Sequence, residues 1–330
     1  MQKRAIGPFT VNPIGLGCMN LSHAYGVPPE RSAAITLLNE ALDLGYDHFD
    51  TAALYGFGAN ETLIGEAVGH RRADYLLASK CVLGRGPDGK RVIDGRPETI
   101  KATCEAALQR LRTEVIDLYY LHRLDRTVPI EESVGALVDL IAAGKIRAIG
   151  LSEMGAETLR KAHAVHPIAA LQTEYSLWSR EAEIAVLQAC QDLGIAFVAF
   201  SPVARGFLTG TLRDLSGLPD NDIRRGMPRF QPEAYGQNLA LLDVMEQAAA
   251  ETGVTMAQIA LAWVLGKGNH IHAIPGTTDL GHLRDNIAAG PLSLPGDLIA
   301  RLEARINNST VTGPRYPAGA QADVDTEMFA

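Results

Sequence analysis

Four side chains that could together move a proton follow short apolar stretches of this sequence. They are a carboxylate, Asp50, a phenol, Tyr55, an amine, Lys80, and an imidazole, His122. A buried lysine needs a counter-ion, and Asp50 can supply one to Lys80. A phenol has an ordinary pKa of about 10, so it becomes a useful acid near neutrality only beside a cation. The set predicts a general acid, Tyr55, tuned by Lys80 and Asp50, with His122 orienting a carbonyl or relaying a proton.

The size of the expected effect on Tyr55 follows from Coulomb's law. At about 4 Å and an effective dielectric constant near 20, Lys80 stabilises the phenolate by about 4 kcal/mol, or roughly three pK units. Taken singly, Asp50 could cap a turn and Tyr55 or His122 could simply pack in the core. Lysine is rarely buried without a purpose. Together, at one end of three consecutive strands, the four residues predict a catalytic site.

Apolar strands and amphipathic helices alternate along the chain. We expect a β-hairpin within residues 1–15 and then eight strands, at 14–19, 46–50, 75–80, 115–122, 147–152, 169–173, 196–201 and 271–275. We expect helices at 30–44, 60–69, 96–112, 130–143, 156–164, 180–193, 237–252, 256–265, 280–289 and 297–307. Eight strand–helix units predict a (β/α)8 TIM barrel, an α/β fold, here with an N-terminal β-hairpin and extra C-terminal helices. Catalytic residues of this fold lie at the C-terminal ends of the strands.

A doubly wound open sheet is the competing fold. The segment Gly15-Leu16-Gly17-Cys18-Met19-Asn20 lacks the third glycine of a dinucleotide fingerprint, which favours the barrel. No linker divides the chain, so residues 1–330 are expected to form a single domain. Residues 202–235 show no period, and a segment of that length inside a compact domain predicts a functional loop.

Composition excludes several functions. With 30 basic and 38 acidic residues the net charge is -8, and no basic cluster stands out, so nucleic acid and membrane surfaces are not expected partners. No apolar run has the roughly 20 residues needed to cross a bilayer, and the N-terminus lacks a signal-peptide pattern. The four scattered cysteines predict reduced thiols, no metal site and a cytoplasmic location. A metal-dependent lyase or hydrolase would need more ligands than Asp50 and His122.

Three segments carry a resemblance to a known family. Residues 50–56 (Asp-Thr-Ala-Ala-Leu-Tyr-Gly), 77–80 (Leu-Ala-Ser-Lys) and 118–122 (Leu-Tyr-Tyr-Leu-His) resemble signature segments of the aldo-keto reductases. Further similar segments, at 149–153, 171–176, 200–210 and 274–277, extend the resemblance over nearly the whole chain. It implies a barrel that binds a nicotinamide cofactor in extended form and reduces an aldehyde or ketone to an alcohol, reversibly, by hydride transfer. By position, Tyr55 is the implied proton donor.

The resemblance also implies the residues that bind the cofactor. Ser152 and Gln172 would hydrogen-bond the nicotinamide carboxamide, Phe200 would stack on the ring, and residues 201–210 would wrap the pyrophosphate with Arg205 as a charge partner. The implied cofactor-binding residues are Ser152, Gln172, Phe200, Ser201, Pro202, Arg205, Gly206, Leu208, Gly276, Thr277, Thr278, His282 and Asn286.

The substrate-binding residues are expected from the position of the loops in this fold. Met19, Tyr25 and Trp178 are the candidates, together with the loops 85–95, 123–127 and 220–231. Trp178 could equally pack in the core. The expected partner is a small-molecule carbonyl compound or alcohol, and a homo-oligomer is compatible with the resemblance.

Two positions depart from the family pattern. Members that prefer NADPH usually carry Lys or Arg where this chain has Thr278 and Asp279, so NADP(H) is the family default while NAD(H), or use of both, stays open. Arg284 is a candidate substitute cation. Glu153 stands where many members have Asn, and the sequence names no partner for its carboxylate. A nicotinamide-sensing accessory subunit on the same fold remains the alternative function.

Overall fold

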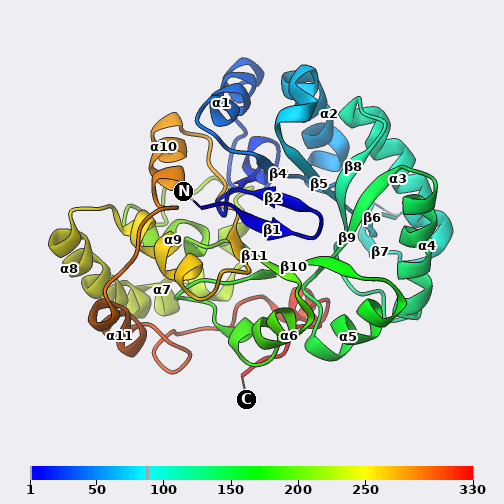
Figure 1. Ribbon diagram of the computed structural model, residues 1–330. Helices are drawn as coiled ribbons and strands as arrows, with labels where there is room; N and C mark the ends of the chain where they lie inside the picture. The colour runs from blue at the N-terminus through cyan, green and yellow to red at the C-terminus, as the bar shows by residue number, and fades with distance from the viewer. Residues whose placement is uncertain (1, 87–88, 330) are drawn as a thin grey trace.

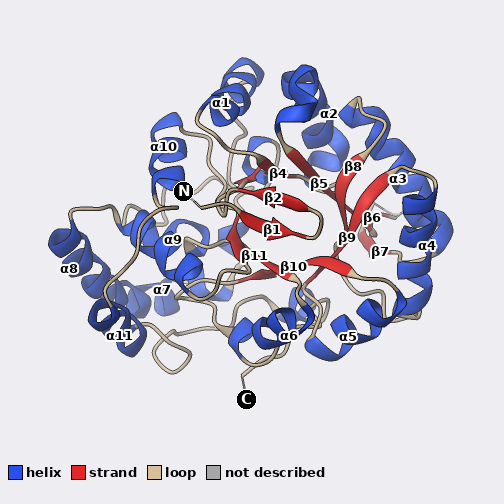
Figure 2. Cartoon of the chain, in the orientation of Figure 1, coloured by secondary structure: helices blue, strands red, loops and turns tan. Residues whose placement is uncertain are grey.

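A closed barrel of eight parallel strands forms the centre of the molecule, with helices around it (Figure 2). The computed structural model describes residues 2–86 and 89–329. The barrel strands are β3 (Leu16–Gly17), β4 (His48–Asp50), β5 (Leu76–Cys81), β8 (Ile116–Leu121), β9 (Ile146–Ser152), β10 (Ile168–Glu174), β11 (Ala196–Phe200) and β12 (Ile271–Ala273). Each pairs in parallel with the next, in the order β3-β4-β5-β8-β9-β10-β11-β12. The predicted (β/α)8 barrel is confirmed.

The sheet closes where its first and last strands meet. Ile14 forms a parallel bridge with Ala273, and the Gly15 amide donates to the Ala273 carbonyl at 2.9 Å. A side chain at Gly17 would place its Cβ 2.7 Å from the Ile274 carbonyl oxygen. The closure therefore needs a residue without a Cβ beside the mouth of the barrel.

The helices cover the outside of the barrel with their apolar faces inward. In α1 (Arg31–Asp43), for example, Leu37, Leu38 and Ala41 are buried at helical spacing. The other helices that follow the strands are α2 (Ala59–Val68), α3 (Pro97–Leu111), α4 (Ile130–Ala142), α5 (Ala156–Val165), α6 (Val186–Leu193), α7 (Pro232–Leu239), α8 (Asp243–Thr252), α9 (Met256–Gly266) and α10 (Leu280–Ala288).

The N-terminal hairpin, β1 (Arg4–Ile6) and β2 (Phe9–Val11), lies across one end of the barrel (Figure 1). Ile6 and Val11 join a core cluster with inward-facing strand residues such as Leu76 and Leu118. The hairpin confirms the prediction for residues 1–15. Because it closes the end where the strands begin, the opposite end remains for the site.

Three predicted boundaries were wrong. The helix expected at 180–193 begins only at Val186, after a 3₁₀ turn at Glu181–Glu183 in which Ala182 is fully buried. The helix expected at 237–252 is divided into α7 and α8 by a 3₁₀ turn at Ala240–Leu242. Residues 83–93 contain the hairpin strands β6 (Leu83–Arg85) and β7 (Arg91–Ile93) instead of a plain loop. In each case tertiary contacts override local periodicity.

The C-terminal part carries α11 (Gly296–Arg305), the helix expected at 297–307, and a short helix that was not predicted, α12 (Ala318–Gln321). After α11 the chain returns to the barrel (Figure 1). There Arg315 and Thr326 contact Glu153 just beyond β9. In the described residues, no single helix is long and apolar enough to cross a membrane, although the bent pair Pro232–Thr252 and Met256–Gly266, at 94°, has the length and composition jointly.

Candidate active site

Asp50, Lys80 and Tyr55 form one buried chain of polar contacts. Lys80 Nζ pairs with Asp50 Oδ1, donates to the Thr51 carbonyl at 2.9 Å and lies 3.2 Å from Tyr55 Oη. Asp50 ends β4 and Lys80 lies near the end of β5, its parallel neighbour, so the pleat brings both side chains to the same mouth. The structure thus supplies the counter-ion that the sequence predicts for Lys80.

The turn after Tyr55 sets the direction of the phenol. Gly56, Phe57 and Gly58 all have positive φ angles, of 57°, 52° and 94°. Glycine adopts such angles without steric cost because it has no Cβ, so the two glycines make this turn possible. The following helix anchors this turn, because Asn60 accepts from Thr51 Oγ1 at 2.6 Å and donates to the Cys18 carbonyl at 2.8 Å. These contacts hold the phenol over Lys80.

His122 stands beside Tyr55 just after β8. The two rings meet edge to face with centroids 5.9 Å apart. Burial lowers the pKa of His122 well below its ordinary value, and the charges of Arg123, Lys80 and Arg91 lower it further. The imidazole is therefore neutral at physiological pH and carries one N–H.

The expected pKa of Tyr55 was wrong in direction. Burial raises the pKa of the phenol above 10, and the Lys80 charge only partly opposes this increase. The Coulomb estimate omitted desolvation, which penalises the phenolate when the ring is buried. For Lys80, burial acts to lower the pKa, but the charges of Asp50 and Tyr55 raise it overall, so the amine stays charged.

A cavity of about 770 Å³ opens at this mouth of the barrel. Most of the predicted site residues line it, namely Met19, Tyr25, Asp50, Tyr55, His122, Ser152, Gln172, Phe200, Ser201, Pro202, Arg205, Gly206, Gly276, Thr277, Thr278, His282 and Asn286. The predicted loops at 85–95, 123–127 and 220–231 also contribute lining residues, although positions 87 and 88 lie outside the described residues.

Three predicted site residues do not line the cavity. Lys80 lies beneath Tyr55, with its Nζ 3.2 Å from the phenol oxygen. Leu208 and Trp178 are buried in the core, where Trp178 stacks on Phe207 at a centroid distance of 4.2 Å and meets Phe230 edge to face. For Trp178 the structure favours packing, because two aromatic rings occupy its faces.

Two predicted cofactor ligands are already engaged within the protein. The Gln172 amide donates to Asp50 Oδ2 at 2.7 Å. Arg205 forms a buried ion pair with Glu174 at 2.7 Å and also donates to the hydroxyls of Tyr25 and Tyr316. The charge of Arg205 is thus balanced by a carboxylate within the fold, which differs from its expected role as a free partner for pyrophosphate.

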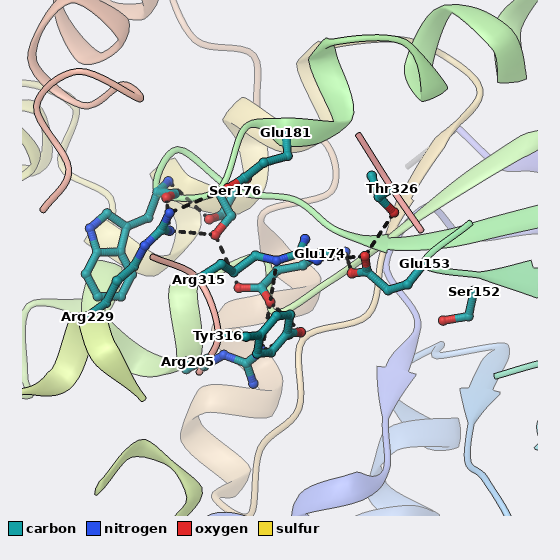
Figure 3. Close-up of polar contacts among 12 residues, drawn as sticks. Ser152, Glu153, Glu174, Ser176, Glu181, Arg205, Arg229, Arg315, Tyr316 and Thr326 are labelled. Carbon is teal, nitrogen blue, oxygen red and sulfur yellow. Dashed lines mark hydrogen bonds and ion pairs between the residues drawn. The ribbon is translucent and has the colours of Figure 1, made fainter. Parts of the chain in front are cut away.

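Glu153 has the partner that the sequence could not name. Its Oε2 atom accepts from Arg315 at 2.7 Å and from Thr326 at 2.9 Å, and its Oε1 accepts from the Glu174 amide at 2.9 Å (Figure 3). Glu153 is fully buried and has a φ of 54° directly after β9. The C-terminal segment thus supplies the charge that compensates this carboxylate.

The segment after β12 presents a polar wall without an acidic side chain from Asp279. Asp279 caps α10 by accepting from the His282 amide at 2.8 Å, and it does not line the cavity. Arg284, the expected substitute cation, pairs with Glu40 at 3.5 Å and does not line the cavity either. Thr277, Thr278 and His282 line the cavity at this end, together with Asp285 and Asn286 of α10.

Arg91, Arg123 and Arg224 are the arginines by which the three predicted loops reach the wall, and the structure adds Asp285 and Tyr316, which sequence reasoning did not single out. Arg123 directly follows His122, so its position could have been read from the strand end. Tyr316 carried no such signal, because only the return of the C-terminal segment places it here.

Comparisons with known proteins agree with this geometry. The model of the aldo/keto reductase family matches residues 13–307. The chain belongs to the aldo/keto reductase family. It is also 40% identical over 327 residues to the aldo-keto reductase yakc [NADP(+)] of Schizosaccharomyces pombe, covering 97% of this chain and 96% of that protein.

Solved structures of aldo/keto reductases have the same fold. A glycerol dehydrogenase from Gluconobacter oxydans has a TM-score of 0.85 and 28% identity, covering 96% of this chain and 98% of that one. An aldo/keto reductase from Klebsiella pneumoniae, in complex with NADP and acetate, has a TM-score of 0.74 and 26% identity, with 96% and 99% covered. This aldo/keto reductase is therefore an NAD(P)-dependent oxidoreductase that acts on small-molecule carbonyl compounds. Nothing in the comparisons supports an accessory-subunit role.

Proposed function

We propose that this protein reduces an aldehyde or ketone to the alcohol with Tyr55 as the proton donor. The observation that carries the proposal is the buried Asp50–Lys80–Tyr55 chain, whose phenol faces the cavity beside a neutral His122. A nicotinamide cofactor bound in the cavity would supply the hydride for the carbonyl carbon. The residues of the chain supply the proton, the orientation and the electrostatic stabilisation.

Tyr55 and His122 have separate tasks in this proposal. The protonated phenol donates its proton to the carbonyl oxygen, and the charged Lys80 stabilises the phenolate that remains. The neutral imidazole of His122 donates a hydrogen bond to the same oxygen and stabilises the developing alkoxide. Asp50 keeps Lys80 charged and in place.

The residues of the wall fit a nicotinamide dinucleotide. Phe200 offers an aromatic face, and Ser152 and Gln172 offer polar groups at the ends of β9 and β10. Ser201, Ala204 and Arg205 have positive φ angles of 51°, 51° and 57°, a backbone form that turns amide groups toward an anion. We assign the predicted cofactor residues to this role, with Arg205 acting through its position in the turn. Leu208 is the exception, because its side chain is buried in the core and its amide donates to the Val203 carbonyl.

NADP(H) is the favoured cofactor. The Schizosaccharomyces pombe relative is named for NADP(+), and the Klebsiella pneumoniae structure contains NADP. Thr277, Thr278 and His282 can donate hydrogen bonds to a 2′-phosphate. The Asp279 carboxylate lies 4.0 Å from the His282 ring but accepts from the His282 amide as a helix cap, which offsets part of its charge. This arrangement weakens the repulsion that favours NAD(H), which remains the alternative.

Fluorescence titration with NADPH and NADH in parallel tests the cofactor. We expect NADPH to bind at least tenfold more tightly, because only it carries the phosphate that these donors recognise. Equal binding, or tighter NADH binding, would show that Asp279 sets the preference.

The Tyr55→Phe variant tests the proton donor. We expect the rate of carbonyl-dependent NADPH oxidation to fall by about 10²- to 10⁴-fold. The dissociation constant for NADPH should stay within about twofold, because the ring is kept. Tyr75→Phe, before β5 at the other end of the barrel, is the control and should retain the rate. Full activity in Tyr55→Phe would contradict the assignment.

A further inference from the structure

Two guanidinium groups stand on the cavity wall beside the candidate catalytic residues. Arg91 lies on β7, and Arg123 directly follows His122 at the end of β8. Both line the cavity. Burial lowers the pKa of Arg91, and the charge of Arg123 lowers it further, so the two groups lie near each other.

Arg123 differs from the other arginines of this wall. Each of the other three has a carboxylate partner, in the pairs Arg91–Asp323 at 2.8 Å, Arg205–Glu174 at 2.7 Å and Arg224–Asp222 at 2.7 Å. In the described part of the chain Arg123 has none. Its Nη1 donates to the His122 carbonyl at 2.6 Å and lies 3.4 Å from Ser152 Oγ, and its buried Nε has no hydrogen-bond partner.

A half-buried guanidinium without a counter-ion is costly, because water is partly removed and no carboxylate replaces it. A ligand that brings one negative charge would satisfy the group. Arg favours carboxylates, whose two oxygens match its planar fork of donors. The single uncompensated charge of Arg123 fits a monoanion.

The position in the barrel separates Arg123 from the cofactor phosphates. In the closed eight-stranded order, β8 lies four strands from β12, on the opposite side of the barrel. The candidate phosphate-binding groups, Thr277, Thr278 and His282, follow β12. Arg123 instead lies close to the reacting groups, since its charge lowers the pKa of His122 and opposes the increase at Tyr55.

We propose that Arg123, with Arg91 beside it, binds a carboxylate on the substrate, so that this enzyme prefers aldehydes or ketones that carry a carboxylate group. The inference rests on the proposed function and names the substrate class of the same site. In the reaction the carbonyl carbon gains the hydride from the reduced nicotinamide, the oxygen gains the Tyr55 proton, and the carboxylate is unchanged.

Matched substrates test this preference. We would compare 4-carboxybenzaldehyde with methyl 4-formylbenzoate, its neutral ester, and succinic semialdehyde with its methyl ester, each at saturating NADPH. We expect kcat/KM to be at least tenfold higher for each carboxylate than for its ester. The preference should weaken as salt concentration rises, because part of the attraction is electrostatic.

The variant Arg123→Gln tests the residue. We expect its loss in kcat/KM to be at least tenfold greater for the carboxylates than for the esters, mainly through KM, with Arg123→Lys recovering part of it. The dissociation constant for NADPH should stay within about twofold. Arg301→Gln is the matched control, because Arg301 is an exposed arginine of α11 that pairs with Glu251 and does not line the cavity.

Each other outcome has a defined meaning. Equal reduction of acids and esters by the unmodified protein would overturn this inference while leaving the proposed function intact. Equal losses for acids and esters in Arg123→Gln, together with weaker NADPH binding, would assign Arg123 to the cofactor instead. Failure to reduce any of the four compounds would overturn the proposed function and this inference with it.

Discussion

Burial, more than charge, sets the protonation states of the two candidate proton-handling residues. The pKa of Tyr55 is raised above 10 by burial despite Lys80, and the pKa of His122 is lowered well below 6.5. A phenol with a raised pKa stays protonated up to alkaline pH, and an imidazole with a lowered pKa stays neutral down to acid pH. Over a wide pH range, Tyr55 therefore stays protonated and His122 stays neutral, and these are the forms that carbonyl reduction requires.

This predicts a flat pH profile for reduction. Between about pH 6 and 9, we expect kcat/KM for the carbonyl compound to change less than about threefold, because neither group titrates there. Steady-state rates at saturating NADPH in buffers of constant ionic strength would measure it. A tenfold fall between pH 7 and 8 would instead show that Lys80 brings the pKa of Tyr55 close to neutrality.

At the scale of elements, the C-terminal segment stabilises the ends of β9 and β10. Arg315 pairs with Glu153, and Tyr316 donates to Glu174 at 2.9 Å while accepting from Arg205 (Figure 3). Asp325 accepts from the Gly155 amide at 2.9 Å and so satisfies a donor at the start of α5. The segment thereby joins the last residues of the chain to the candidate site.

Glu153→Gln tests whether the contacts of the C-terminal segment with Glu153 stabilise the fold. Removing the charge leaves the buried Arg315 only Glu174, which is 4.0 Å away and already paired with Arg205, so the free energy of unfolding should fall by about 3–5 kcal/mol. Urea denaturation would measure the change. The double variant Glu153→Gln/Arg315→Met should recover part of the loss, because it removes the uncompensated charge as well.

The matched control for Glu153→Gln is Glu157→Gln. Glu157 is exposed and pairs with Lys161, one turn later on α5. Its removal should change the free energy of unfolding by less than about 0.5 kcal/mol. A similar small effect for Glu153→Gln would show that the buried pair does not stabilise the fold.

At the scale of the molecule, closure makes the strands depend on one another. The first and last barrel strands meet at Ile14 and Ala273, and Arg4 donates to the Ile271 carbonyl and, at 3.0 Å, to the Gly268 carbonyl near the start of β12. Contacts between residues so far apart in the chain form only when the whole ring is complete. The prediction of one domain over residues 1–330, and those of a cytoplasmic location and a homo-oligomer, stay predictions.

Cooperative unfolding is the expected consequence of this closure. Tryptophan fluorescence and far-ultraviolet circular dichroism should report the same urea midpoint, because no part of the ring is stable alone. NADPH at 100 times its dissociation constant should raise the free energy of unfolding by about 2.7 kcal/mol. Two separated transitions would contradict the single-domain prediction.

Local pattern determined much of this protein. Strand and helix alternation predicted the barrel, because residues buried on both faces of a parallel strand must be apolar in sequence. Asp50, Tyr55, Lys80 and His122 could be found because each lies at the end of such a strand or shortly after it, and strand ends meet at one mouth of a barrel.

Tertiary structure decided what depends on residues far apart in the chain. The partner of Glu153 lies 162 positions away at Arg315, and no local pattern indicates that contact. Arg205 is paired with Glu174, Trp178 is stacked within the core, and Asp279 is turned away as a helix cap. The tertiary structure also decides the pKa of Tyr55. Desolvation depends on every group packed around the ring, and the sequence alone does not specify that packing.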